Sequence, residues 1–178
     1  LHEYLRSSEL EGIDQQRIIC HAIIKADLRG STQITEELTR RQLNPATHFS
    51  RHFFNPINDV IDKFGAEKVF IEGDAVILIL NEFDAPHAEH LCVSRACTLA
   101  VELLRVVQHQ NRLLEGYGLP PLELGLGIAF NDTPPRYLFD NEHRITISPA
   151  INRADRLSSC HWAVKSWFRS TTSAALVR

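Results

Sequence analysis

The stretch that says most about the architecture is RIICHAIIKADLRGST, residues 17–32. The first eleven of them are β-branched and nearly continuous in apolar character, which predicts a buried strand near the centre of a sheet. The strand is expected to stop at Asp27 and to be followed by a turn over residues 28–30. Ser31 and Thr32 then predict a helix start, with their hydroxyl groups as caps. A carboxylate is therefore placed at the end of a central strand, directly before a helix.

A second carboxylate is expected close to the first. The stretches EKVFIE (67–72) and AVILIL (75–80) predict two strands joined by the tight turn Gly73-Asp74. If this hairpin lies beside the first strand, Asp27 and Asp74 converge at one edge of the sheet, where paired carboxylates suit a hard cation such as Mg²⁺. Taken singly, Asp27 is equally explained as an edge carboxylate, and Asp74 as part of a turn.

The remaining pattern completes an α+β fold. Apolar periodicity predicts helices over 46–63 and 87–114, strands over 122–130 and 143–148, and a final helix that begins at Ser148-Pro149 and reaches Ser158. Residues 131–142 are rich in turn formers and receive no element. The order β-α-α-β-β-α-β-β-α predicts a ferredoxin-like βαββαβ core, with helices packed on a mostly antiparallel sheet.

Composition limits the kind of protein. The 178 residues carry a formal net charge of −3, so no basic surplus favours nucleic acid as a partner. No apolar run is long enough to span a membrane, and no membrane contact is expected within this chain. Four cysteines without metal-ligand spacing favour a cytoplasmic location. The absence of any Met suggests a fragment of a larger protein, and such a protein could be membrane-associated through parts outside this chain. Within the chain, 1–16 is expected to be a lead-in, 17–160 the domain and 161–178 an extension of unknown role.

Asn152 and Arg156 form a third polar feature, in the sequence SPAINRADRL (148–157). A spacing of four places both side chains on one helix face, while Ile151, Ala154 and Leu157 are expected to pack inward. An amide and an always-charged guanidinium on one face can hold a triphosphate and a ribose. The alternative is a solvated polar face, in which Asp155 pairs with a neighbouring arginine.

Taken together, these segments resemble the class III nucleotidyl cyclase catalytic domain, the adenylate and guanylate cyclase family. The family motif F-x-D-[IL]-x-G-F-T is matched by IIKADLRGST (23–32), and I-G-D-x-[VLM] by VFIEGDAVILIL (69–80). The motif V-N-x-A-x-R-[LM] is matched by INRADRL (151–157). The order of the three motifs and the spacing between them agree with the family over roughly residues 17–160.

The resemblance implies a role for each matched residue. Asp27 and Asp74 would hold two Mg²⁺ or Mn²⁺ ions, with the carbonyl group of Leu28 as a further ligand. Asn152 would orient the ribose, and Arg156 would stabilise charge on the α-phosphate. In this family the aspartates and the Asn/Arg helix of one active site come from different protomers, which implies a homodimer acting on a nucleoside triphosphate. The expected phosphate-binding residues are Gly30, Ser31 and Thr32.

The chain departs from the family where the base is read. Phe70 stands four residues before Asp74, where Lys or Glu is usual, and Ile145 stands where Asp, Thr or Cys is usual. Strand alternation places Lys68, Phe70, Glu72 and Asp74 on one side, so a small shift could bring Lys68 or Glu72 near the base. Ser148 replaces the motif glycine before the last helix.

Two functions follow from this pattern. The retained metal and phosphate residues favour an active cyclase that converts a nucleoside triphosphate to a 3′,5′-cyclic nucleotide and pyrophosphate in signal transduction. The lost base-reading residues favour a catalytically inactive module that binds nucleotide or dimerises within a larger signalling protein. A diguanylate cyclase ranks third, because EGDA (72–75) is not GGDEF.

Overall fold

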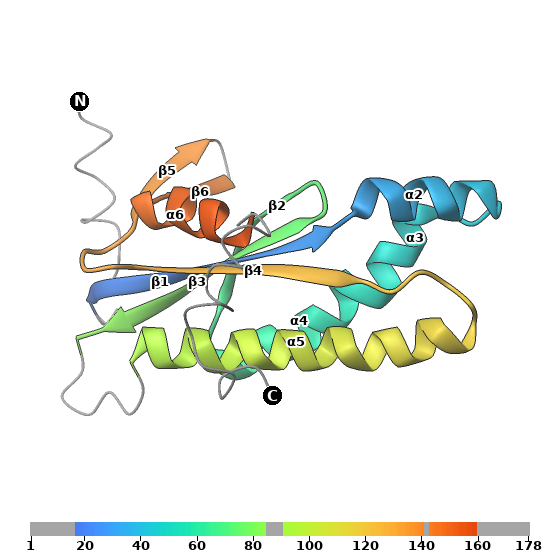
Figure 1. Cartoon of the computed structure of the whole chain (residues 1–178). Helices are drawn as coiled ribbons and strands as arrows, with labels where there is room; N and C mark the ends of the chain where they lie inside the picture. Colours follow the sequence, from blue (N-terminus) through green and yellow to red (C-terminus); the bar gives the residue numbers. More distant parts are fainter. Residues whose placement is uncertain (1–16, 85–90, 141–142, 160–178) are drawn as a thin grey trace, which may run out of the picture.

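The computed structural model describes residues 17–84, 91–140 and 143–159. In these residues a four-stranded sheet lies between a layer of helices on one face and a small hairpin with one helix on the other (Figure 1). Along the chain the elements are β1 (Ile18–Arg29), α2 (Ser31–Arg40), α3 (Pro45–Phe49), a π-helical turn (Ser50–Phe54), α4 (Asn55–Ile61), a 3₁₀ turn (Asp62–Phe64), β2 (Glu67–Glu72), β3 (Ala75–Phe83), α5 (Cys92–Gly116), β4 (Glu123–Asn131), β5 (Arg136–Asp140), β6 (His143–Ile147) and α6 (Pro149–Ser158).

The main sheet has the strand order β2-β3-β1-β4, and every neighbouring pair is antiparallel. This order places β1 inside the sheet, as its apolar sequence predicts, with β2 and β4 at the edges. Strands β5 and β6 form a separate two-stranded sheet. The ferredoxin-like α+β architecture expected from the sequence is confirmed.

Alternation along β1 divides the core between the two faces of the sheet. Ala22, Ile24 and Ala26 face the helical layer, where α5 runs along the length of the sheet (Figure 1). Ile23 belongs to a smaller cluster on the opposite face, under α6. The larger core also contains Leu38, Phe53, Ile57, Leu78, Leu99 and Leu103, and the smaller one contains Ile77, Ile79, Ala129, Ala150 and Ala154.

The predicted end of the first strand is wrong by two residues. Strand β1 continues to Arg29, because β4 pairs with it as far as the register Arg29↔Glu123. Gly30 then adopts the left-handed conformation, with φ of 66°, and is itself the N-cap of α2. Ser31 is the first helical residue, and no side chain caps this helix, so the predicted hydroxyl cap is also wrong.

Other boundaries differ in smaller ways. The predicted helix 46–63 is present as a continuous helical segment from Pro45 to Phe64, with the π-helical turn in its middle. Helix α5 begins at Cys92, and the predicted residues 87–90 lie outside the described part of the chain. Strand β5 occupies Arg136–Asp140, within the stretch to which the sequence assigned no element. Helix α6 matches its prediction, with the Ser148 side chain accepting from the amide of Ala150 at 3.0 Å.

The predicted lead-in 1–16 and the predicted extension 161–178 lie outside the described residues. Among the residues that the structure describes, no helix combines the length and the apolar character needed to cross a membrane.

Candidate active site

Asp27 and Asp74 lie at the same end of the neighbouring strands, next to the β2–β3 turn, as the sequence predicts. Asp27 pairs in register with Ala75, so Asp74 directly precedes the residue that faces Asp27 across the two strands. Gly73 makes the turn between β2 and β3 possible, because its φ of 62° is a conformation that other residues rarely adopt. Both carboxylates are therefore fixed by a central strand and a tight turn, which is a rigid support for a binding site.

The two carboxylates influence each other. Burial raises the pKa of Asp27 above its ordinary value, and the nearby negative charge of Asp74 raises it further. The positive charges of Lys25 and Arg29 act in the opposite direction without cancelling these effects. Because the pair repels in the absence of a cation, a positive ion between Asp27 and Asp74 would relieve that repulsion.

Lys25 is a polar residue of this region whose role the sequence analysis missed. It lies in β1, and its side chain is only 8% exposed. Its Nζ atom donates to Glu72 Oε2 at 2.8 Å and to Asp155 Oδ1 at 2.6 Å. Burial lowers the pKa of Lys25, but the bonds to Asp155 and Glu72 outweigh that effect, and the net direction is upward. A lysine inside an otherwise apolar strand is the signal that could have identified it.

The start of α2 follows β1 directly (Figure 1). The first amide groups of a helix have no carbonyl partner within it, and they carry the positive end of the helix dipole. Here the amide of Ile34 is bonded to the carbonyl oxygen of Gly30 at 3.0 Å, while Gly30 and Thr32 are exposed and Ser31 is half-buried. The predicted phosphate-binding residues thus surround an accessible helix N-terminus three to five residues after Asp27.

Asn152 and Arg156 are both exposed on α6, while Ala150, Ala154 and Ser158 form its buried face. At 100° per residue, Asn152 and Arg156 point away from the sheet that carries Asp27. Leu157 is 50% exposed, so its predicted inward packing is wrong, because the buried stripe runs through every fourth residue from Ala150.

The sequence also left open that Asp155 pairs with a neighbouring arginine on the helix, and this alternative is wrong. Its carboxylate bonds to Lys25, beneath the helix, and Arg153 instead donates to the carbonyl oxygen of Phe130 at 2.8 Å. The polar residues of α6 are therefore not simply a solvated face of internal ion pairs. One of them, Asp155, ties the helix to β1.

The two residues at the predicted base positions are partly exposed. Phe70 on β2 is 41% exposed, and Ile145 on β6 is 42% exposed. The predicted alternation along β2 is wrong at Lys68, because the register shifts between Lys68 and Phe70. Lys68 opposes Leu78, which faces the helical layer, whereas Phe70 opposes Ile77 and shares the face of α6. Lys68 is thus moved to the other side of the sheet from Phe70.

The donor set at Asp27 and Asp74 fits a hard cation. In the described part of the chain, no cluster of three or more His, Cys, Asp or Glu residues could hold a metal ion. Two carboxylates and the neighbouring carbonyl group of Leu28 supply oxygen ligands only and leave positions for water and phosphate, which is how Mg²⁺ is commonly bound. A zinc-type site with nitrogen or sulfur ligands is not what these residues offer.

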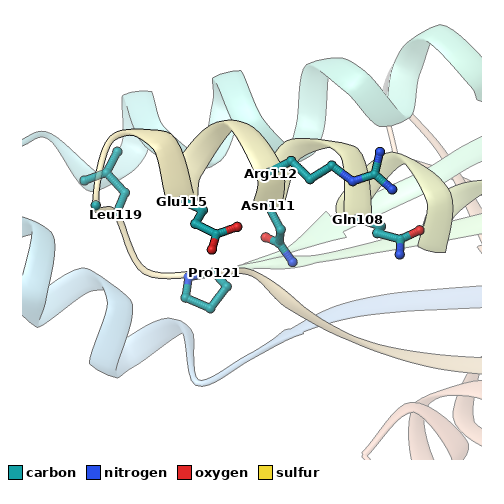
Figure 2. Close-up of a pocket in the computed structure, with 7 residues that line it drawn as sticks. Gln108, Asn111, Arg112, Glu115, Leu119 and Pro121 are labelled. Atoms are coloured by element: carbon teal, nitrogen blue, oxygen red, sulfur yellow. The ribbon is translucent and has the colours of Figure 1, made fainter.

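A cavity lies elsewhere, along the C-terminal half of α5 (Figure 2). Because α5 packs on the helical face of the sheet, this cavity is on the opposite face from Asp27 and α6. None of the predicted site residues lines it, so it is not part of the candidate active site. Its lining residues are Gln108, Asn111, Arg112, Glu115, Gly118, Leu119 and Pro121.

Comparisons with known proteins test the fold that carries this site. No family model matches the sequence, and no curated protein matches it significantly. Among solved structures, the guanylyl cyclase Cya2 is 25% identical, with a TM-score of 0.64 over 82% of this chain and 72% of that one. The adenylyl cyclase CyaB from P. aeruginosa is 18% identical, with a TM-score of 0.66 over 89% of this chain and 84% of that one.

A third solved structure is a non-canonical dimeric guanylyl cyclase domain of the RhoGC fusion protein from the aquatic fungus Blastocladiella emersonii. It is 16% identical, with a TM-score of 0.60 over 83% of this chain and 76% of that one. The fold is therefore that of the class III adenylate and guanylate cyclase catalytic domains. The resemblance to this family is confirmed at the level of the fold, and the chain has the fold of a divergent cyclase domain.

Proposed function

We propose that the chain is an active nucleotidyl cyclase, which converts a nucleoside triphosphate to a 3′,5′-cyclic nucleotide and pyrophosphate. A fold alone does not establish an activity. The observation that carries the proposal is that Asp27 and Asp74 lie close together at the same end of the strands. The pKa of Asp27 is raised by burial and by the charge of Asp74. Two repelling carboxylates without a cation are hard to explain as a purely structural feature, because they cost stability.

The metal-binding half of the site consists of Asp27, Asp74 and the carbonyl group of Leu28. When bound there, two Mg²⁺ or Mn²⁺ ions supply activation of the ribose 3′-hydroxyl group and neutralise charge on the triphosphate. The free amides at the start of α2, next to Gly30, Ser31 and Thr32, bind phosphate oxygens. The 3′-hydroxyl group releases its proton to water, its oxygen forms a bond to the α-phosphorus, the bond from the α-phosphorus to the oxygen that bridges to the β-phosphate breaks, and pyrophosphate leaves.

The other half of the site consists of Asn152 and Arg156. Asn152 orients the ribose, and the guanidinium of Arg156 stabilises the negative charge that develops at the α-phosphate. Because both side chains point away from their own sheet, we propose that they complete the site of a second copy of the chain. A homodimer would then hold two such shared sites.

Exposed apolar side chains favour this dimer. Strands β5 and β6 present Leu138, Phe139, Ile145 and Ile147, which are 42–59% exposed. Neighbouring apolar side chains on a surface commonly mark an interface. The edge strand β2 adds Phe70 and Ile71, and the ion pair between Arg144 and Glu67 at 2.5 Å connects β6 to this strand.

The base is expected to be chosen loosely. Phe70 and Ile145 offer an aromatic ring and a branched apolar side chain, which can contact any base but cannot match its hydrogen-bonding groups. We therefore propose that more than one nucleoside triphosphate is converted, with comparable kcat/KM. A cytoplasmic location, where these substrates are available, remains a prediction from the sequence.

The second candidate is a catalytically inactive module that binds nucleotide or dimerises. The apolar Phe70 and Ile145 favour it, because a site that no longer reads the base is one sign of a lost activity. It shares the fold, the dimer and the apolar surface with the first candidate. The two candidates differ only in whether the α-phosphate reacts.

The test incubates the purified protein with Mn²⁺ or Mg²⁺ and each of ATP, GTP, CTP and UTP, and identifies the products by mass. A cyclic mononucleotide together with pyrophosphate supports the active cyclase, provided that Asp27→Ala and Asp74→Ala abolish both products. If no triphosphate is converted at concentrations that support dimerisation, the inactive module is the better reading. Product that persists in both aspartate variants would refute the metal-binding assignment.

A further inference from the structure

One buried amino group connects both halves of the candidate site within a single chain. Lys25 Nζ on β1 contacts Glu72 Oε2 on β2 at 2.8 Å and Asp155 Oδ1 on α6 at 2.6 Å. Three elements that are far apart in sequence thus meet at one charge. The separations along the chain are 47 residues for Glu72 and 130 residues for Asp155.

Each contact lies beside a residue with a proposed role. Lys25 is two residues before Asp27, and both face the α6 side of the sheet. Glu72 is two residues before Asp74, at the start of the turn that carries it. Asp155 is next to Arg156 on α6. A displacement of Glu72 or Asp155 would therefore move Asp74 or Arg156 with it.

Stability alone is a poor explanation for this arrangement. Burying an ammonium group is costly, and Glu72 and Asp155 are 61% and 50% exposed, so water weakens their attraction to Lys25. An apolar side chain of similar volume would stabilise such a position as well or better. The motifs that the chain resembles have Phe at the position of Lys25 and Ile at that of Glu72, whereas this chain has an ion pair there.

We propose that Lys25 is a positioning residue that sets helix α6 and the β2–β3 turn in their working orientation. The inference rests on the proposed cyclase with shared sites. In such a dimer the Asp27/Asp74 half of one chain serves one active site, and the Asn152/Arg156 half of the same chain serves the other. One lysine per chain therefore supports both active sites, through Glu72 on the metal side and through Asp155 on the Arg156 side.

The test uses a dimer with a single intact site. A chain with Asp27→Ala is mixed with a chain carrying Arg156→Ala, so that the only complete site takes its aspartates from the second chain and Arg156 from the first. Glu72→Gln, Asp155→Asn or Lys25→Met is then added to one chain at a time. Because an error in positioning acts on the reacting geometry, kcat is expected to fall about tenfold, with a much smaller change in KM.

The expected pattern depends on which chain is altered. Glu72→Gln is expected to lower kcat only when it is in the chain that supplies the aspartates. Asp155→Asn is expected to lower kcat only when it is in the chain that supplies Arg156. Lys25→Met is expected to lower kcat in either chain. A loss of general stability would instead lower activity for every variant in every chain. Glu102→Gln, which removes the ion pair with Arg105 on α5 at 2.5 Å, is the matched control and changes kcat in neither chain. Effects of Glu72→Gln and Asp155→Asn that do not depend on the chain would overturn the proposal.

A second measurement does not require activity. Amide hydrogen exchange is recorded on the full chain without nucleotide, for the unaltered protein and for Lys25→Met. Faster exchange confined to α6 and to the β2–β3 turn is expected, and unchanged exchange there contradicts the proposal. If the unaltered protein converts no nucleoside triphosphate but exchange in Lys25→Met responds as expected, the proposed cyclase activity fails while the positioning by Lys25 stands.

Discussion

Asp27 is a single residue whose ionised side chain lowers the free energy of unfolding of the metal-free protein. A carboxyl group whose pKa is raised in the folded state binds its proton more tightly there than in the unfolded chain. At neutral pH its ionised form therefore costs stability, and this cost disappears when the charge is removed or when a cation binds. The cause is burial first and the charge of Asp74 second.

Asp27→Asn is expected to raise the melting temperature of the metal-free protein and to lower kcat at least about a hundredfold, because the variant lacks a charged metal ligand. Thermal unfolding in EDTA and in Mn²⁺ provides the measurement. Mn²⁺ should stabilise the unaltered protein and leave the variant unchanged. Asp59→Asn, at an exposed position of α4, serves as the control. A lower melting temperature for Asp27→Asn in EDTA would contradict the account of this carboxylate.

His21 makes stability depend on pH. Its fully buried ring contacts the carbonyl oxygen of Thr133 through Nδ1 at 2.8 Å and the hydroxyl of Ser148 through Nε2 at 2.7 Å. These partners are satisfied by a neutral ring that donates from Nδ1 and accepts at Nε2. Burial lowers the pKa of His21, and the positive charge of Arg153 lowers it further, although the bond to Thr133 acts in the opposite direction.

Because the pKa of His21 is lower in the folded protein than in the unfolded one, the unfolded chain takes up a proton first as the pH falls. The stabilising contribution is complete above the ordinary value of about 6.5 and decreases below it. Urea unfolding at pH 7.5 and 5.5 should show a smaller loss for His21→Gln than for the unaltered protein. Burial also lowers the pKa of His48, so the stability of the His21→Gln variant still depends on pH through His48. An identical loss in both proteins would show that His21 does not contribute.

At the residue scale the sequence predicted Asp27, Asp74, Asn152 and Arg156 as candidates, because their types and spacing carry information. It did not predict the partners of buried polar groups. The Ser148 cap follows from Ser-Pro at a helix start, but its bond to His21 joins residues 127 positions apart. The role of Lys25 was not predicted for the same reason, because Glu72 and Asp155 are distant from it in sequence.

At the scale of elements, glycines on β4 determine how closely α6 approaches the sheet. A Cβ atom placed on Gly127 would lie 1.9 Å from the carbonyl oxygen of Ala154, and one on Gly125 would lie 2.5 Å from that of Ser158. Both contacts are with helix backbone, which cannot rotate away as a flexible side chain would. Helix α6 rests directly on these two glycines and is displaced if either acquires a side chain.

Gly127→Ala is expected to lower the free energy of unfolding by about 1–3 kcal/mol, the usual cost of overpacking, and to reduce activity by moving Asn152 and Arg156. Gly116→Ala is the matched control, because nothing lies within 4 Å of its added methyl group at the end of α5. The control should be neutral or stabilise by about 0.5 kcal/mol through a more restricted unfolded chain. Chemical denaturation of both variants measures the difference, and equal stability would contradict the close approach of α6.

Elements with long periodic patterns were predicted well, and elements that depend on a neighbour were not. The final two residues of β1 are strand because β4 pairs with them, although Leu28-Arg29-Gly30 reads locally as a turn. Strand β5 exists only as the partner of β6, within a stretch of Asn, Asp and Pro that favours turns. The bulge in β2, which moves Lys68 away from Phe70, likewise depends on the register with β3.

At the scale of the whole molecule, the two halves of the candidate site face different directions. Asp27 and Asp74 lie at one end of the strands, whereas Asn152 and Arg156 are on the exposed side of α6. Sequence spacing cannot show this, since it gives which residues share a helix face but not where the helix is directed. Each chain contains all four of these residues but holds the two pairs apart. A site shared between two chains would bring the aspartates of one chain to the Asn/Arg pair of the other.

Whether active sites are shared between protomers is decided by the activity of a mixture of two inactive chains. Asp27→Ala and Arg156→Ala are each expected to make no cyclic nucleotide alone. Mixed in equal amounts, they should recover about a quarter of the unaltered specific activity, because half of the dimers are mixed and each of those has one intact site. A mixture as inactive as its two components, although mixed dimers form, would contradict a cyclase whose active sites are shared between protomers.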